Sequence, residues 1–471
     1  MKLIGDFLME ITYAVYNLLW GDLFYLPLPG GSSVGISLLI LILIPAGIYF
    51  TIRTRFLPIR CLPEMLRITV EKRTGNKTGA ISGLQALVVS TATRVGMGNM
   101  VGVVAAVSAG GAGAVFWMWV TALIGSSTAF VEATLAQLHK RPDPLYGGYR
   151  GGPAYYIHDF FTKGKNKRYS IIAVLFALSG LLCWCGVSQV ISNSVSDAFY
   201  NAFEIPPIVS TVILVALAAV IVLRKNTTVK VLDIIVPIMA AFYFIIALFV
   251  VFTNLGQMPA VCARIFEEAF GVRQMVAGGF GAALMQGVKR GLFSNEAGSG
   301  SAPCAEAAAE VNHPAKAGLF QAFGVFIDTI VICTCTAMIM LLTPAELLDG
   351  LSGMSLLQTA MHYHFGEVGV IFIAVTLWLC CFSTFIGILF YARSNVAYLF
   401  GDNWWSQTAY KILALVMLFI GGLAAYEFVW DLGDLGIGLM TVFNMIAILP
   451  MGGQAIASLN EYSSLRKKGK I

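Results

Sequence analysis

The chain has 471 residues, of which 58% are hydrophobic and only 12% are charged, and its mean hydropathy is +0.80. A soluble protein of this length carries about twice that charged fraction, so the composition excludes an ordinary soluble protein and indicates an all-α polytopic membrane protein. The net charge of +5 does not indicate a nucleic-acid partner, because the basic residues gather in alternate loops between apolar segments.

The N-terminal segment 1–33 is apolar and aromatic but carries Asp6, Glu10 and Asp22, which indicates a helix lying in the membrane interface. A spanning helix needs about 20 mostly apolar residues. Eleven later segments meet that requirement: 34–52, 80–110, 114–138, 169–200, 206–223, 229–253, 273–310, 316–342, 367–396, 407–425 and 431–452.

The spans after the first fall into two sets of five, at 80–253 and 273–452, and each set opens with a long helix that contains a Gly-rich break. Five is odd, so the two sets would have opposite orientations, which is the inverted repeat of many secondary transporters. Any eleven-span protein can be divided in this way, but the paired breaks favour a true repeat. Residues 34–79 then form an additional span with a basic loop, and 453–471 form a basic tail.

Basic residues predict the orientation of the chain. Lys and Arg are concentrated in the loops 53–79, 139–168 and 224–230 and in the tail, whereas the alternate loops are acidic or neutral. Because basic loops stay in the cytoplasm, we expect the N-terminus outside and the C-terminus inside an inner or plasma membrane.

The first break contains Gly96, Gly98 and Asn99, next to Arg94. A helix breaks within the bilayer only where it lines a cavity, and its exposed N–H groups then attract a carboxylate while freed carbonyls coordinate a cation. The alternative is that the glycines are only a packing device. The arginine favours a functional role, since an intramembrane charge is costly.

The second break, 293–301, is small and polar and cannot face lipid. Glu296 in this segment is expected either to pair with Lys289 or Arg290 or to brace the broken helix. In the ninth span, Ser383 and Thr384 are adjacent hydroxyls that bind either a ligand or their own helix backbone. In the fourth span, a polar stripe faces the interior as helix contact or substrate wall; it comprises Gln189, Ser192, Asn193 and Ser196.

Other chemistries lack support in this sequence. There is no G-x-x-x-x-G-K-[ST] phosphate loop and no H-E-x-x-H motif, so we expect neither direct ATP drive nor protease activity, no enzyme and no organic cofactor. The nine cysteines include pairs two residues apart, which point to different helix faces and make poor metal ligands.

Four runs, 93–103, 113–119, 151–157 and 289–301, resemble the alanine or glycine:cation symporter family, and the likeness extends from about residue 50 to 455. The resemblance implies a leucine-transporter-like fold and import of small neutral amino acids coupled to Na⁺. It further implies a sodium site made by the main-chain carbonyls of Ala92 and Val95 and the hydroxyls of Ser383 and Thr384.

The same resemblance implies a substrate pocket. The amino-acid carboxylate would meet N–H groups near Gly96, Met97, Gly98 and Asn99, and Gln189, Phe293, Ser294 and Asn295 would line the other sides. The sequence departs from the family at Met97, where many members have Thr, and at Ile388, where many have Trp. The smaller Ile388 predicts a pocket that admits a longer side chain, such as that of glutamine.

Three alternatives remain open. A proton-coupled transporter would use a buried carboxylate, for which Glu132, Asp233, Glu296 and Asp328 are candidates. An ion channel would need a continuous polar pore, and a sensor would bind an amino acid without moving it. Beyond substrate and lipid bilayer we expect no partner, and we expect a monomer.

Overall fold

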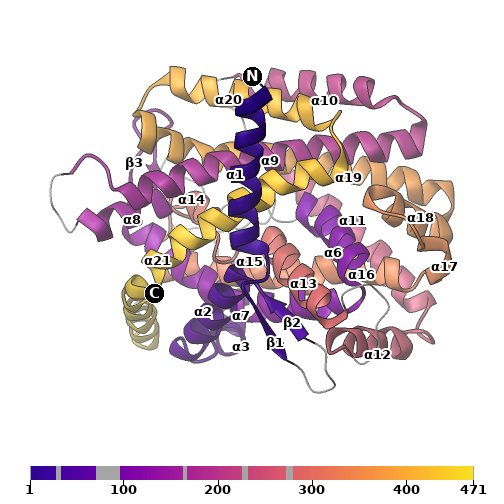
Figure 1. Cartoon of the computed structure of the whole chain (residues 1–471). Coiled ribbons are helices and arrows are strands. Elements are labelled where there is room, and N and C mark those ends of the chain that lie inside the picture. The colour runs from indigo at the N-terminus through magenta and orange to yellow at the C-terminus, as the bar shows by residue number, and fades with distance from the viewer. Residues whose placement is uncertain are drawn as a thin grey trace.

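The computed structural model describes residues 2–27, 33–70, 96–162, 167–224, 232–271 and 279–469. These residues are mostly helical, as predicted, and Figure 1 shows the long helices crossing the molecule. The strands form two short antiparallel hairpins, one of β1 (Phe24–Pro27) with β2 (Ser33–Ile36) and one of β3 (Arg141–Pro142) with β4 (Tyr149–Arg150).

The first half of the chain contains these helices: α1 (Lys2–Trp20), α2 (Leu38–Arg53), α3 (Leu57–Arg60), α4 (Leu62–Val70), η1 (Gly98–Gly102), α6 (Val103–Gly110), α7 (Gly113–Leu138), α8 (Pro153–Thr162), α9 (Ile171–Phe203), α10 (Pro207–Val222), α11 (Leu232–Thr253) and α12 (Met258–Ala269). The second half contains α13 (Gly279–Asn295), α14 (Pro303–Glu306), α15 (Pro314–Val325), η3 (Phe326–Cys333), α16 (Thr334–Leu341), α17 (Ala345–Leu348), α18 (Gly353–Phe365), α19 (Glu367–Phe400), α20 (Trp404–Gly421) and α21 (Tyr426–Lys467). Segments η1 and η3 are π-helical.

Five continuous helical segments of the described chain are long and apolar enough to span a membrane: Gly113–Leu138, Ile171–Phe203, Pro314–Leu341, Glu367–Phe400 and Phe428–Lys467. Helices α11 and α12 pass the same test only as a pair, bent by 105°. The polytopic helical class is therefore confirmed. The count of eleven spans and the inverted repeat stay predictions, and parts of the predicted second and seventh spans, 80–95 and 273–278, lie outside the described residues.

Helices α12 and α18 lie in segments for which no helix was expected. Helix α12 turns back across the start of α7, where Glu268 Oε2 accepts a hydrogen bond of 2.5 Å from the Ala112 N–H. Arg264 Nε donates to the other oxygen of the same carboxylate at 2.7 Å. A carboxylate at a helix N-terminus satisfies free N–H groups and is favoured by the helix dipole. Helix α18 packs against α19 and α9.

Helix α9 lies at the centre of the bundle and packs against α19, α20 and α21. Glycines let α9 and α21 approach to backbone contact. A Cβ atom on Gly186 would lie 2.3 Å from Gly433 N, and one on Gly436 would lie 2.3 Å from the Cys183 Cα. Small residues commonly allow such close packing in membrane bundles, and here it fixes the distance between two walls of the site described below.

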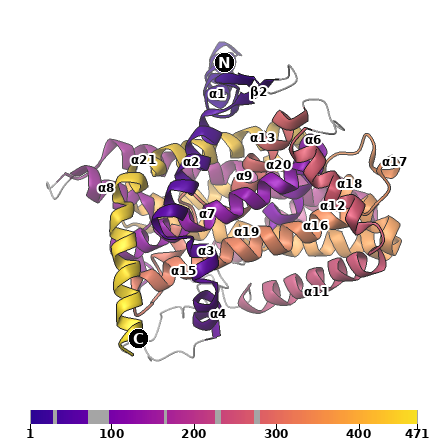
Figure 2. The same ribbon diagram turned by 90° about the horizontal axis from the view of Figure 1, so that it is seen from below.

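Two of the four segments that the sequence predicts to be cytoplasmic, the loop 53–79 and the C-terminal tail, are in contact. Glu64 in α4 accepts hydrogen bonds from Arg67 and Tyr462 and pairs with Arg466 in the tail at 2.7 Å. Figure 2 shows α8 and the C-terminal end of α21 at one end of the bundle and α12, α17 and α18 at the other. Burial alone would raise the pKa of Glu64, but Arg67, Tyr462 and Arg466 outweigh it and lower that pKa.

A second contact on this side joins α7, α8 and α21. His139 Nδ1 lies 2.9 Å from Asp159 Oδ2, and His139 Nε2 lies 3.1 Å from Gln454 Oε1. Burial would lower the pKa of His139, but the hydrogen bonds to Asp159 and Gln454 raise it overall. The pKa of Asp159 is lowered, because its bonds to His139 and Arg141 outweigh its burial.

Candidate substrate and ion site

The first break is described from Gly96 onward and continues as the π-helix η1, a form that often marks functional sites. The Gly96 N–H donates to Asn99 Oδ1 at 2.9 Å. The Met97 N–H donates to Thr384 Oγ1 in α19 at 3.3 Å. The main chain here is thus held by side chains, one of them from a helix almost 300 residues away.

The second break lies where the sequence predicts it. Helix α13 ends at Asn295, and the next helix, α14, begins at Pro303. Between them Glu296, Gly298 and Gly300 adopt left-handed conformations with φ of +55°, +100° and +81°. At 300 an added Cβ would also lie 2.6 Å from the rigid ring of Pro153, whereas at 298 it would meet the flexible ends of Met445 and Leu43.

The two breaks touch each other. A Cβ on Gly98 would lie 3.0 Å from the Ser294 Cα and 3.4 Å from the Phe293 carbonyl oxygen. Only a residue without a side chain lets the backbone of η1 approach that of α13 so closely. The segments that the sequence marks as broken therefore form one structural unit, although they are almost 200 residues apart.

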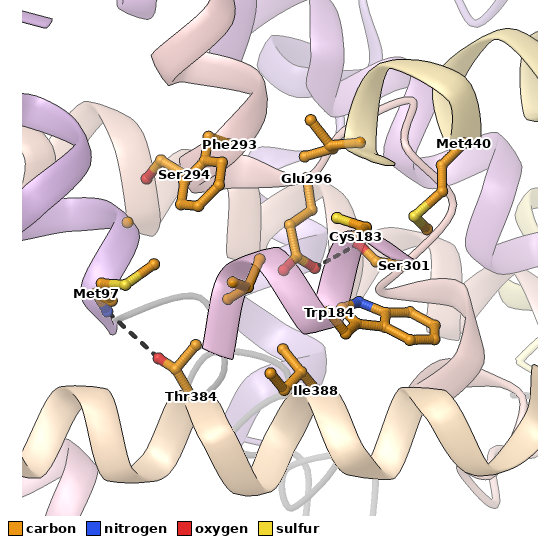
Figure 3. Close-up of a pocket in the computed structure, with 13 residues that line it drawn as sticks. Met97, Cys183, Trp184, Phe293, Ser294, Glu296, Ser301, Thr384, Ile388 and Met440 are labelled. Carbon is orange, nitrogen blue, oxygen red and sulfur yellow. Dashed lines mark hydrogen bonds between the residues drawn. The ribbon is translucent and has the colours of Figure 1, made fainter. Parts of the chain in front are cut away.

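A small cavity of about 30 Å³ lies beside this contact (Figure 3). Its walls come from the two breaks and from α9, α13, α19 and α21. They consist of Met97, Gly98, Cys183, Trp184, Val187, Phe293, Ser294, Glu296, Ser301, Thr384, Ile388, Ile437 and Met440. The cavity has room for about two water molecules, so a larger solute requires the walls to move apart.

Six of the sequence-predicted residues line this cavity: Met97, Gly98, Phe293, Ser294, Thr384 and Ile388. Others lie elsewhere. Asn295 lines a separate space beside Thr121 and Ala297, and its Oδ1 accepts from the Ala297 N–H at 3.0 Å. Gly96 and Asn99 line a third space, beside Tyr243 and Cys380.

Gln189 also lies away from the cavity, with its Nε2 3.2 Å from Met417 Sδ in α20. Helix α9 presents Cys183, Trp184 and Val187 to the cavity. Two residues beyond Val187 correspond to about 200° of rotation on a helix, so Gln189 is on the opposite face. In the predicted polar stripe, Asn193 Nδ2 donates to the carbonyl of Ala424 at 2.8 Å and Ser196 Oγ to that of Gly422 at 3.1 Å, and both residues line another cavity.

The predicted sodium ligands are described only in part. Ala92 and Val95, like Arg94, lie outside the described residues. The Thr384 hydroxyl faces the cavity and the first break, whereas the Ser383 hydroxyl donates to the Cys380 carbonyl of its own helix at 2.7 Å. The described residues contain no cluster of three or more His, Cys, Asp or Glu suited to a metal, and all nine cysteines are free thiols.

Asp328, in the π-helix η3, is the hub of a buried polar network next to the cavity. It is 0% exposed, and its Oδ1 accepts from Asn99 Nδ2 at 2.7 Å. Its Oδ2 accepts from the hydroxyls of Ser294 and Thr329 at 2.9 and 2.8 Å. One carboxylate therefore holds a side chain from each break. The sequence marked Asp328 only as a candidate proton carrier.

The expected pairing of Lys289 or Arg290 with Glu296 is wrong, because both cations pair with Asp434 in α21. The Arg290 guanidinium donates to both Asp434 oxygens at 3.0 and 3.1 Å, and Lys289 Nζ lies 2.7 Å from Oδ2. Residues 289 and 290 precede Glu296 by six or seven residues, which is about 10 Å along the helix, and α21 brings Asp434 much closer to both cations. The Arg290 guanidinium also covers the Trp430 ring at 3.9 Å.

Several wall residues were not predicted, namely Cys183, Trp184, Val187, Ser301, Ile437 and Met440. Except for Ser301, which belongs to the polar second break, their side chains look like ordinary core in the sequence. The sequence offered one signal for them, the glycines at 433 and 436 in α21. These glycines allow α21 to approach α9 closely, and the residues of α9 near that contact line the cavity.

A model of the sodium:alanine symporter family matches residues 31–471. The chain belongs to this family. Members are transporters and not enzymes, as the sequence predicts. The probable sodium/glutamine symporter GlnT of Bacillus subtilis is 43% identical over 92% of this chain and 89% of its own length. The amino-acid carrier protein AlsT of the same organism is 42% identical over 91% of this chain and 90% of its own.

A more distant member, the sodium/alanine symporter AgcS of Methanococcus maripaludis, is 33% identical to this protein over 91% of the present chain and 95% of its own length. Among solved structures, a manganese transporter of Eremococcus coleocola has a TM-score of 0.51 at 14% identity, over 83% of this chain and 81% of that one. The likeness concerns the fold alone.

Proposed function

We propose that this protein is a Na⁺-coupled symporter that imports small neutral amino acids, such as alanine, glycine or glutamine, by alternating access. The substrate binds in the cavity between the two breaks. Na⁺ binds nearby, held by the main-chain carbonyls of Ala92 and Val95 and by the hydroxyls of Ser383 and Thr384. The protein works as a monomer in the cell membrane, with its N-terminus outside and its C-terminus in the cytoplasm.

The observation that carries this proposal is the convergence of both breaks on one cavity. Gly98 contacts the backbone at Ser294, and the Met97 N–H reaches across to Thr384. A solute in this cavity meets main-chain groups of η1 and α13 together, and its presence or absence alters how these segments and α19 pack. Such a site suits alternating access, in which one part of the bundle moves against another around a fixed ligand.

The small cavity volume is what an occluded conformation would have. About 30 Å³ is too little for an amino acid. We infer that the walls, chiefly the side chains of Phe293, Ile388 and Met440, separate when substrate enters.

The driving force suffices for one Na⁺ per substrate. One charge crossing about 100 mV releases about 2.3 kcal/mol, and a tenfold Na⁺ gradient adds about 1.4 kcal/mol. Together they amount to about 3.7 kcal/mol, enough for roughly a 500-fold gradient of a neutral amino acid.

The test is uptake of labelled alanine into proteoliposomes with an imposed inward Na⁺ gradient. Uptake should require Na⁺, and Thr384→Ala should raise the Na⁺ concentration for half-maximal uptake at least tenfold. Ser179→Ala is the matched control, because this hydroxyl only donates to the Leu175 carbonyl in α9 and should leave uptake unchanged. Uptake that does not depend on Na⁺ would contradict the proposed sodium site.

Proton coupling is the second candidate, and two buried carboxylates favour it. Asp328 is 0% exposed and Glu132 is 1% exposed. Glu132 Oε1 accepts from Asn444 Nδ2 at 2.7 Å, and the same amide donates to the carbonyl of Gly298 in the second break. Uptake that persists without Na⁺ but collapses with a protonophore would support this mechanism. The side chain of Asp233, the remaining candidate, lies outside the described part.

A further inference from the structure

A second cavity, of about 430 Å³, lies apart from the small cavity between the two breaks. We call it the outer cavity and the small one the central cavity. Helix α9 forms one wall with Asn193, Ser196 and Asp197, and the start of α18 and the turn between α20 and α21 form others. Its volume is within the range of about 300–1,000 Å³ that is typical of small-molecule sites. The function proposed above does not use this cavity.

The outer cavity lies at the end of the bundle that the proposed orientation places outside the cell. Helix α18 is at that end, opposite α8 and the C-terminal end of α21 (Figure 2). A row of aromatic rings leads from the outer cavity to the central one. Tyr426 lines the outer cavity, and its ring centroid is 6.3 Å from that of Trp430. The Trp430 ring packs in turn against Phe293, a wall residue of the central cavity, at 4.9 Å.

Asp197 presents a carboxylate to the outer cavity in a fixed orientation. Its Oδ2 accepts a hydrogen bond of 3.0 Å from the Met354 N–H in the first turn of α18. Gly353 makes room for this bond, because a Cβ there would lie only 3.3 Å from Oδ2, and its φ of +59° favours glycine. The other oxygen, Oδ1, has no hydrogen-bond partner among the described residues, with which Asp197 also forms no ion pair. One oxygen is thus available to a ligand.

The ligand that this carboxylate selects is cationic and carries N–H donors. A partly buried carboxylate is stabilised by a cation with which it forms hydrogen bonds. No basic residue is among the described residues that line the outer cavity, so these residues do not supply the cation. Tyr200 and Tyr426 line the same cavity, and aromatic rings also attract ammonium groups. The cavity therefore combines the two kinds of group that commonly recognise an organic ammonium ion.

A metal ion fits this cavity less well. Asp197 is the only acidic residue among its described wall residues, whereas Ca²⁺ takes about six to eight oxygen ligands. Two main-chain carbonyls of the wall, those of Gly422 and Ala424, already accept hydrogen bonds from side chains of α9. The oxygen atoms left for a metal are therefore few.

The α18 wall carries hydroxyl groups suited to the carboxylate of a ligand. Ser352 and Ser355 both line the outer cavity. Ser355 Oγ accepts from Asn201 Nδ2 at 3.1 Å, which leaves its O–H able to donate to a ligand. Both serines are within two residues of Met354, which holds Asp197, so the acceptor and the donors lie close together. An α-amino acid zwitterion, with its ammonium and carboxylate on one carbon, matches this arrangement.

We propose that the outer cavity is a second binding site for the amino acid, in which Asp197 receives the ammonium group. The substrate binds here before it reaches the central cavity. This inference rests on the proposed amino-acid transport, and it adds a site that the two breaks do not form. It predicts that the protein binds two amino acid molecules at once, of which only the outer one depends on Asp197.

The experiment counts the labelled alanine bound at equilibrium to the purified full-length protein in saturating Na⁺. The wild type should bind two alanine molecules per chain, and Asp197→Asn should bind one. Ser352→Trp should also bind one, because a ring on this exposed wall residue fills the outer cavity and leaves Asp197 in place. Glu204→Gln is the matched control and should bind two, since it removes an exposed carboxylate at the same end of α9 that does not line the cavity.

Two competitors test the recognition of the ammonium group. Ethylammonium, which lacks the carboxylate, should displace one of the two alanine molecules from the wild type, and propionate, which lacks the ammonium, should leave that molecule bound. The proposal is overturned if the wild type binds a single alanine, if Asp197→Asn and Ser352→Trp both still bind two, or if propionate displaces the outer alanine and ethylammonium does not. A wild type that binds no alanine in Na⁺ would instead contradict the proposed function itself.

Discussion

The amide of Asn99 donates a hydrogen bond of 2.7 Å to the carboxylate of Asp328. It joins the first break to the π-helical turn between α15 and α16. Because the other oxygen of Asp328 accepts from Ser294, the same carboxylate also holds the second break. The two breaks therefore share one anchor, and a change at Asp328 is transmitted to both of them.

Replacing Asp328 by Asn should reduce alanine uptake about 10- to 100-fold. The amide presents donors of its own to Asn99 and Ser294, and a buried hydrogen bond to a charged group is worth about 1.5–3 kcal/mol. Proteoliposome uptake at fixed protein density measures the loss. Thr329→Val is the control, since it removes one donor to Asp328 but leaves both breaks attached; an equal loss in the two variants would contradict the anchoring role.

Gly98→Ala should reduce uptake at least tenfold, whereas Gly102→Ala should remain within about twofold of wild type. An added methyl at 98 meets the backbone of Ser294 at 3.0 Å and must separate the two breaks, while at 102 it meets nothing within 4 Å. Both glycines belong to η1 and both are buried, so the pair is closely matched. Similar uptake by the two variants would show that contact between the breaks is dispensable.

Ile388→Trp should abolish glutamine uptake and leave alanine uptake within about threefold. Ile388 lines a cavity of about 30 Å³, so a larger ring removes the space into which a long substrate side chain extends. Competition by unlabelled glutamine and alanine against labelled alanine measures both effects. Val375→Trp, on the exposed face of the same helix at 46% exposure, controls for the bulk of the ring. Equal loss of both substrates would reject Ile388 as a determinant of substrate length.

Loss of Asp434 should destabilise the protein more than loss of Arg290. Asp434→Leu leaves two buried cations unpaired, whereas Arg290→Met leaves Asp434 still paired with Lys289 at 2.7 Å. Removing one partner of a buried ion pair costs about 3–5 kcal/mol. Thermal unfolding in detergent should therefore give the lower melting temperature for Asp434→Leu, and the reverse order would contradict the three-residue arrangement.

His139→Gln should lower the melting temperature more at pH 6 than at pH 9. The folded pKa of His139 is raised, so its stabilisation is fully present below the unfolded value near 6.5 and is lost as pH rises through the folded value. Asp159, whose pKa is lowered, stays ionised across this range. The effect should be about 1 kcal/mol at most, since the pair is partly exposed.

His362→Gln supplies the comparison for that pH series. His362 also lies near a carboxylate, at 3.1 Å from Glu367 Oε1, but both side chains are more than half exposed. Its substitution should change the melting temperature little at either pH. A destabilisation by His139→Gln that is the same at pH 6 and pH 9 would show that packing, and not the charge of the imidazolium, is responsible.

The sequence predicts what depends on local composition. The helical class follows from apolar runs, and the end of α13 at Asn295 follows from the small polar residues after it. Helices α12 and α18 could not be predicted from apolar runs because, at 12 and 13 residues, they are shorter than a span. Long-range pairing could not be predicted either: nothing near Arg290 in the chain reveals that its carboxylate partner is Asp434.

The candidate site shows the same division. Thr384 and Ser294 stand out in the sequence as polar residues in apolar helices, and both line the cavity. Gln189 stands out for the same reason but turns toward α20, because rotation about the helix axis is set by packing and not by polarity. Trp184 is a cavity wall that resembles any buried aromatic residue, and only the approach of α21 to α9 distinguishes it.

A symporter must couple the movement of its ion to that of its amino acid, so alanine-driven movement of Na⁺ is the decisive measurement. Proteoliposomes with equal Na⁺ inside and outside, clamped at zero potential, receive an inward alanine gradient together with labelled Na⁺. We expect alanine entry to drive a transient net uptake of Na⁺, so that the Na⁺ concentration inside rises above that outside. Thr384→Ala should lose this net uptake. Alanine entry without any net movement of Na⁺ would contradict Na⁺-coupled symport.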